Sequence, residues 1–165
     1  MQRRSFLKAG LLGGLALVAG GAVYRQLRPA VAQRFALDAD GRIMLAALIP
    51  AITGITPDAP ALEAAIDRVG AAINGLPLRV QKEISDLFGL LSMAPTRRLL
   101  AGVPAWQEAT PAELAAFLQS WRTHRTEMLQ TAYHGLHDLV IGGWYAEPSS
   151  WAAIGYPGPM KELSA

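Results

Sequence analysis

The sequence contains no cysteine among its 165 residues. This absence excludes disulfide bonds, thiolate chemistry, iron–sulfur clusters and covalently attached haem. Aromatic residues contribute only 7% and charged residues 17%, whereas hydrophobic residues make up 52% of the chain. A disordered chain would be poor in apolar residues and rich in charge, so this composition predicts a folded protein. The length suits a single domain with little left over.

Acidic residues are missing from the first 34 positions, which hold six basic residues. The remaining positions hold nine basic and thirteen acidic residues, so the body has a formal charge of −4. Because this body carries no basic stripe, we expect it not to bind nucleic acid. The glycine motifs of nucleotide-binding sites and the G-x-S-x-G elbow of hydrolases are also missing. We therefore expect neither a catalytic residue nor a cofactor in this chain.

The N-terminal segment has the three parts of an export signal. A basic start is followed by an uncharged stretch from Ala9 to Tyr24 and by Ala30-Val31-Ala32, a plausible A-x-A cleavage site. Sixteen helical residues span about 24 Å at 1.5 Å each, less than the ~30 Å hydrocarbon core of a bilayer. We predict a signal helix within residues 1–32 and a separate domain over 33–165. The alternative is an uncleaved signal that anchors a scaffold protein in the membrane.

The run Arg3-Arg4-Ser5-Phe6-Leu7-Lys8 resembles the twin-arginine translocation signal, with Gln2 where Ser or Thr is usual. The residues that match the targeting motif are Arg3, Arg4, Phe6, Leu7 and Lys8. The resemblance implies export of a folded protein by the twin-arginine translocase, to the periplasm or the periplasmic face of the inner membrane. Proteins use this route when they assemble with a cofactor or another subunit before they cross the membrane.

Apolar residues in the body recur with helical spacing, and no useful run alternates as a strand would. We therefore predict a small all-α domain of about four to five helices, ending in an aromatic, Pro/Gly-rich loop. The expected helices cover about 42–53, 58–74, 78–92 and 111–144, the last as one helix or as two with a break at Thr123 and His124. Residues 93–104 are expected to form a loop with at most a short helix over 96–101.

Several residues predict where these helices begin and end. Asp38 or Asp40 can cap the first helix, and Pro50 should end or kink it. Asp58 can cap the second helix. Thr110-Pro111-Ala112-Glu113 has the pattern of a capping box with proline in the first turn.

Two of the three histidines, together with an aspartate, form the candidate metal site of this sequence. His134, His137 and Asp138 follow one another at i, i+3 and i+4, so a helix would place all three on one face. That set could bind zinc or another divalent metal. In this alternative the chain is a self-standing periplasmic protein that binds a metal or ligand. The simpler interpretation is a polar helix face opposite an apolar stripe.

The C-terminal segment from Trp144 to Pro159 gathers two tryptophans, two tyrosines, three prolines and two glycines in 16 residues. Aromatic rings on a stiff loop lose little entropy on binding, so such rings serve as interface anchors. The candidate anchors for a partner protein are Trp144, Tyr145, Trp151, Tyr156 and Pro157. The alternative is that the loop folds back and packs these rings over the domain's own core.

The Trp-Tyr-x-x-Pro-x-x-Trp-x-x-Ile-Gly-Tyr-Pro-Gly-Pro arrangement of this segment resembles the tail of a family of small accessory subunits. These subunits accompany flavoprotein dehydrogenases of the GMC oxidoreductase family, such as gluconate, sorbitol, fructose and glucose dehydrogenases. The resemblance implies a non-catalytic subunit that binds an FAD-containing large subunit and supports its folding or maturation. It also implies that the subunit lends its signal to the large subunit for export. A multihaem cytochrome c commonly accepts the electrons in such complexes.

Overall fold

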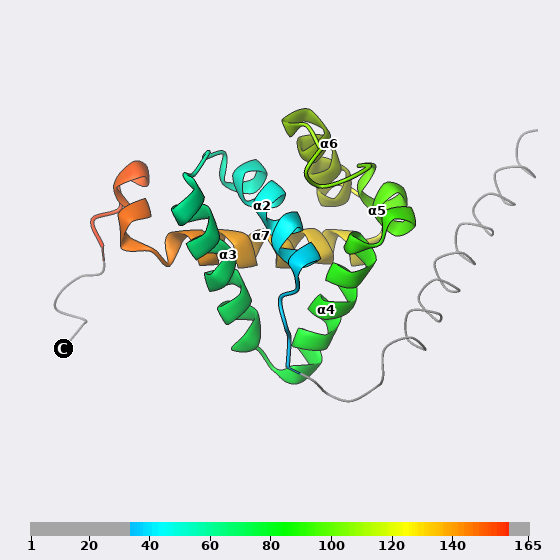
Figure 1. Ribbon diagram of the computed structural model, residues 1–165, viewed down its shortest axis with the longest axis horizontal. Coiled ribbons are helices and arrows are strands. Elements are labelled where there is room, and N and C mark those ends of the chain that lie inside the picture. The colour runs from blue at the N-terminus through cyan, green and yellow to red at the C-terminus, as the bar shows by residue number, and fades with distance from the viewer. Residues whose placement is uncertain (1–33, 159–165) are drawn as a thin grey trace, which may run out of the picture. The chain divides into compact units, whose positions relative to one another are not determined.

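The computed structural model describes residues 34–158, which belong to the unit Gln33–Ala165. The described residues form six α-helices and two short 3₁₀ helices and contain no strand, so the predicted all-α class is confirmed (Figure 1). The helices are α2 (Ala39–Thr53), α3 (Ala59–Asn74), α4 (Leu78–Ser92), α5 (Ala94–Ala101), α6 (Pro111–Arg122), α7 (Glu127–Tyr145), η1 (Pro148–Ser150) and η2 (Ala152–Ile154). None of these described helices is long and apolar enough to cross a bilayer.

The described residues contain six α-helices, one more than the upper end of the expected four to five, because residues 94–101 are fully helical. Residues 94–101 form a complete short helix, α5, whose first turn accepts Pro95 because no N–H is bonded there. The segment 111–144 contains two helices, with the chain breaking at Thr123 and His124 as the sequence suggests. Gly102 ends α5 in the left-handed conformation, with φ of 73°.

α2 packs against α3, α4, α6 and α7 and forms the centre of the domain (Figure 1). It begins after Asp38, whose carboxylate accepts a hydrogen bond from the Gly41 N–H at 2.8 Å. It runs through Pro50 to Thr53, so the predicted end near Thr53 is confirmed and, of the two predicted effects of Pro50, an end or a kink, the end does not occur. Pro50 lies in the last turn, where its missing N–H removes one backbone bond close to the natural end. Gly54 then ends α2 and donates its N–H to the Pro50 carbonyl at 2.9 Å.

The buried side-chain amide of Gln81 joins the start of the domain to the α3–α4 turn. The spacing of apolar residues in the sequence does not reveal it. Gln81 is only 3% exposed. Its Nε2 donates to the carbonyls of Asn74 and Leu76, at 3.1 and 2.7 Å. Its Oε1 accepts from the Phe35 N–H at 2.9 Å, so the side chain holds the segment that leads into α2. All of these bonds satisfy groups that would be costly to bury alone.

The predicted capping box at the start of α6 is present. The Glu113 N–H donates to the Thr110 hydroxyl at 3.3 Å, and the Thr110 N–H donates to the Glu113 carboxylate at 2.8 Å. The pKa of Glu113 is lowered because two groups of Thr110 donate hydrogen bonds to the charged carboxylate. The backbone N–H has the larger effect and the hydroxyl the smaller one. Asp58 likewise caps α3 by accepting from the Ala61 N–H at 2.9 Å, as predicted.

Candidate functional site

The crossing of α3 and α7 is the most extensive helix contact in the described part of the chain. It depends on Gly143, which is buried against Val69 of α3. A Cβ atom at position 143 would lie 2.7 Å from Val69 Cγ2 and 3.3 Å from the Val69 nitrogen. A carbon atom cannot lie so close to these atoms. The backbones of α3 and α7 can therefore approach as they do only because residue 143 has no side chain.

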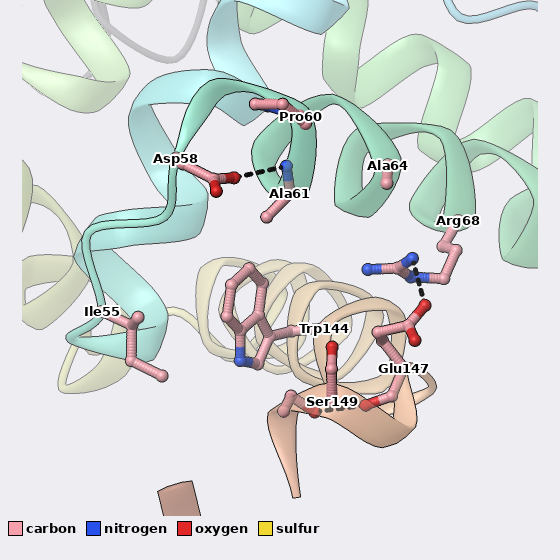
Figure 2. A pocket seen from close by; sticks show the side chains of 10 residues that line it. Ile55, Asp58, Pro60, Ala61, Ala64, Arg68, Trp144, Glu147 and Ser149 are labelled. Carbon is pink, nitrogen blue, oxygen red and sulfur yellow. Dashed lines mark hydrogen bonds and ion pairs between the residues drawn. The ribbon is translucent and has the colours of Figure 1, made fainter.

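Arg68 of α3 holds the end of α7 at this crossing. Its Nε donates to the Gly143 carbonyl at 2.8 Å. Its Nη1 pairs with Glu147 Oε2 at 3.1 Å, as Figure 2 shows. The last carbonyls of a helix lack partners within the helix, and they attract cations because of the helix dipole. Arg68 therefore satisfies the end of α7 and fixes the direction in which the chain leaves it.

A cleft of about 480 Å³ lies beside this contact, between the first half of α3 and the end of α7. Ile55 and Asp58 line one side, Arg68 and Glu147 lie at one end, and Trp144 forms part of the opposite wall (Figure 2). Apolar and charged side chains therefore both line this cleft.

Trp144 belongs to both the core and the cleft. Its side chain is 8% exposed and joins the main hydrophobic cluster. The buried indole Nε1 has no hydrogen-bond partner among residues 34–158. A buried donor without a partner is rare in proteins and costs free energy.

After Glu147 the chain forms a braced tail, which we define as residues 148–158. Trp151 Nε1 donates to the Tyr145 carbonyl at 2.7 Å, and its ring meets the Tyr156 ring edge-to-face at 5.2 Å. The Tyr156 N–H also donates to the Trp151 carbonyl at 3.0 Å. Within this tail, the side chains of Ile154 and Tyr156 are 54% and 46% exposed.

The five predicted anchor residues therefore lie in different environments. Trp144 is buried in the core, and Tyr145 is half-buried against it. Trp151 is half-buried within the tail, whereas Tyr156 and Pro157 are exposed. The structure brings Trp151 and Tyr156 together, and it separates both from the main core cluster. The alternative of rings packed over the core thus describes Trp144 and Tyr145 only.

The sequence pattern does not point to Arg68, and it includes Ile154 in the aromatic segment without marking it as an anchor. Arg68 lies 75 positions from Gly143 and 79 from Glu147, so no local pattern links them. The position of Ile154 between Trp151 and Tyr156, within the aromatic segment, is the sequence feature that could have indicated it.

The alternative metal site rests on His134, His137 and Asp138 of α7. His137 Nδ1 lies 3.3 Å from Asp138 Oδ1, and the Tyr133 ring contacts both histidine rings. Within residues 34–158, no three histidine or acidic side chains come together as a metal would need. These residues form a polar face of the helix.

The targeting residues between Arg3 and Lys8 and the cleavage site at 30–32 lie outside the described residues. No family model, curated protein or solved structure matches this chain. A function for this chain is therefore inferred from its own sequence, side chains and contacts.

We predict that Gly143→Ala lowers the free energy of unfolding by about 1–3 kcal/mol, because the added methyl group overpacks the contact with Val69. Gly142→Ala is the matched control, since a Cβ at position 142 meets no atom within 4 Å. That control should be neutral or stabilising by up to about 1 kcal/mol, because alanine favours helix. Urea unfolding followed by circular dichroism measures both variants. Equal stability of Gly143→Ala and the wild type would contradict this account of the crossing.

Proposed function

We propose that this chain is a non-catalytic small subunit of an FAD-dependent dehydrogenase of the GMC family. It binds the large subunit, aids its folding or maturation, and carries it through the twin-arginine route to the periplasm. The FAD belongs to the large subunit, and a multihaem cytochrome c is the proposed electron acceptor. The proposal is supported by the targeting motif at residues 3–8 and by the form of the C-terminal segment.

The observation that carries the proposal is the exposed apolar pair Ile154 and Tyr156 on the braced tail. Six large hydrophobic side chains are exposed among the described residues, and these two are separated by a single glycine. Trp151 holds the tail in place through its bond to Tyr145, so the pair is presented on an ordered support. Apolar side chains held in advance by their own chain are typical of a protein-binding surface, because little entropy is lost on association.

The position of this surface is also favourable for a subunit that must fold before its partner is exported. The tail leaves α7 directly after the contact with Arg68, so its direction depends on the packed domain. An unfolded chain would not present Ile154 and Tyr156 together on this support. Binding to the large subunit would then select the folded small subunit, which is the form that the twin-arginine route transports.

For export, we predict that Arg3→Lys combined with Arg4→Lys leaves both subunits in the cytoplasm. Lysine keeps the positive charge but removes the guanidinium groups that characterise the motif. Cell fractionation with immunoblotting of both subunits measures the outcome. Arrival of both subunits in the periplasm at wild-type levels would show that the twin-arginine interpretation is wrong.

For binding, we predict that Ile154→Ser combined with Tyr156→Ser weakens the complex with the flavoprotein roughly a thousandfold. Central apolar anchors often contribute ~2 kcal/mol or more each, and 1.4 kcal/mol corresponds to a factor of ten. Both side chains are half exposed, so the free chain should keep its melting temperature. Leu99→Ser is the control, because Leu99 is 62% exposed on α5, outside the tail. Equal affinities of the double variant and the wild type would refute the tail as the binding surface.

A further inference from the structure

The basic side chains of the described residues differ in whether the chain itself neutralises them. Four pair with carboxylates of the same chain: Arg42, Arg68, Arg79 and Lys82. Arg97 donates instead to the carbonyls of Ser92 and Pro104. Within residues 34–158, four guanidinium groups have neither an ion pair nor a hydrogen bond, those of Arg34, Arg98, Arg122 and Arg125. The last three of these belong to two segments that adjoin one another.

The end of α5 and the end of α6 are joined by a hydrogen bond from Trp121. Its indole Nε1 donates to the Leu100 carbonyl at 2.9 Å. Positions 98 and 99 come directly before this carbonyl in α5, and position 122 follows Trp121 at the end of α6. The turn into α7 then continues with exposed residues as far as position 128. We call these two segments, residues 98–99 and 122–128, the basic patch.

The basic patch also holds the two most exposed large apolar side chains of residues 34–158. Met128 is 68% exposed and Leu99 is 62% exposed. Each lies close in sequence to a free arginine, since Arg98 precedes Leu99 and Arg125 lies three positions before Met128. Apolar side chains in water gain free energy when they enter an apolar phase. The patch therefore combines positive charge with apolar side chains that extend into solvent.

The charge of the patch has the opposite sign to that of the domain. Three arginines and Glu127 give the patch a formal charge of +2 with His124 neutral, whereas the positions after 34 have a formal charge of −4 in total. Arginines near an anionic bilayer favour binding, and aliphatic side chains enter the boundary between headgroups and acyl chains. Binding to lipid in this way needs no pocket fitted to a partner. Aromatic anchors, which dominate many protein interfaces, lie instead in the braced tail.

We infer that the basic patch binds the surface of a bilayer that contains anionic lipid. The guanidinium groups of Arg98, Arg122 and Arg125 donate to headgroup phosphates. Leu99 and Met128 enter the boundary below the headgroups. In Figure 1, α5 lies on the opposite side of the domain from the orange-to-red tail, so the tail is free to bind a protein while the patch is on lipid. This inference goes beyond the proposed function and does not depend on the flavoprotein.

The test uses the absence of cysteine, which allows one polarity-sensitive fluorescent probe to be attached at a chosen position of the full chain. Probes on Met128→Cys and on Leu99→Cys should become brighter and shift to the blue when vesicles of phosphatidylglycerol and phosphatidylcholine in equal amounts are added. Because the basic residues between Arg3 and Lys8 also attract such vesicles, the response at each position is measured rather than the amount of bound protein.

The control position is Leu78, which is 50% exposed and begins α4. The far end of α4 leads into α5, and the length of α4 separates the two by about 21 Å at 1.5 Å per residue. The same probe on Leu78→Cys should therefore show no change when vesicles are added.

A charge variant tests the role of the free arginines. Arg98→Gln, Arg122→Gln and Arg125→Gln combined should raise the lipid concentration for a half-maximal response at position 128 roughly a hundredfold. Arg42→Gln, Arg79→Gln and Lys82→Gln combined is the matched control, because it removes three cations that are paired on the surface. That control should change the lipid concentration less than about twofold. For the wild type, about 1 M salt should abolish the response, since the Debye length falls to ~3 Å.

The outcomes separate this inference from the proposed function. No response at positions 99 and 128, or an equal response to vesicles of phosphatidylcholine alone, would overturn the inference. Equal effects of the two charge variants would overturn it as well, because the free arginines would then have no special role. A response to the flavoprotein but not to vesicles would assign the patch to a protein partner instead. Failure to bind the flavoprotein, with the vesicle response intact, would reject only the proposed function.

Discussion

The close contact of Gly143 with Val69 is the constraint on which the functional region depends. It allows the backbones of α3 and α7 to approach closely, so Arg68 can reach the Gly143 carbonyl at 2.8 Å and Glu147 at 3.1 Å. These two bonds set the direction in which the chain leaves α7. The cleft and the braced tail both begin at this point. A small change in the crossing would therefore move the whole candidate surface, and the rest of the domain serves to keep the crossing in place.

The core and the candidate surface meet at Trp144. One part of this side chain fills the hydrophobic core and another lines the cleft, while its buried N–H has no hydrogen-bond partner within residues 34–158. Trp151, seven positions later, is instead satisfied by Tyr145 and supports exposed side chains. The same residue type therefore has two roles in one segment. Trp144 connects the cleft to the core of the domain, and Trp151 gives the tail its own order.

The sequence predicts the helices well because their signals are local. Apolar spacing and the caps at Asp38, Asp58 and Thr110 depend on residues within a few positions of one another. The contacts of Gln81 with Phe35 and of Arg68 with Gly143 join residues 46 and 75 positions apart, and no periodicity reveals them. For the same reason the aromatic segment could be located as a candidate site, whereas its division into buried, half-buried and exposed rings could not. The cleft was not predictable, since its walls come from separate helices.

Hydrogen–deuterium exchange of the full chain, free and bound to the flavoprotein, tests the central claim most directly. The claim is that the partner binds the braced tail. Amide protection reports which backbone segments become ordered or covered on binding. The account predicts new protection in residues 147–158, with little change in α4 and α5. Protection confined to α4, α5 or the α6–α7 turn, with unchanged exchange in residues 147–158, would contradict it.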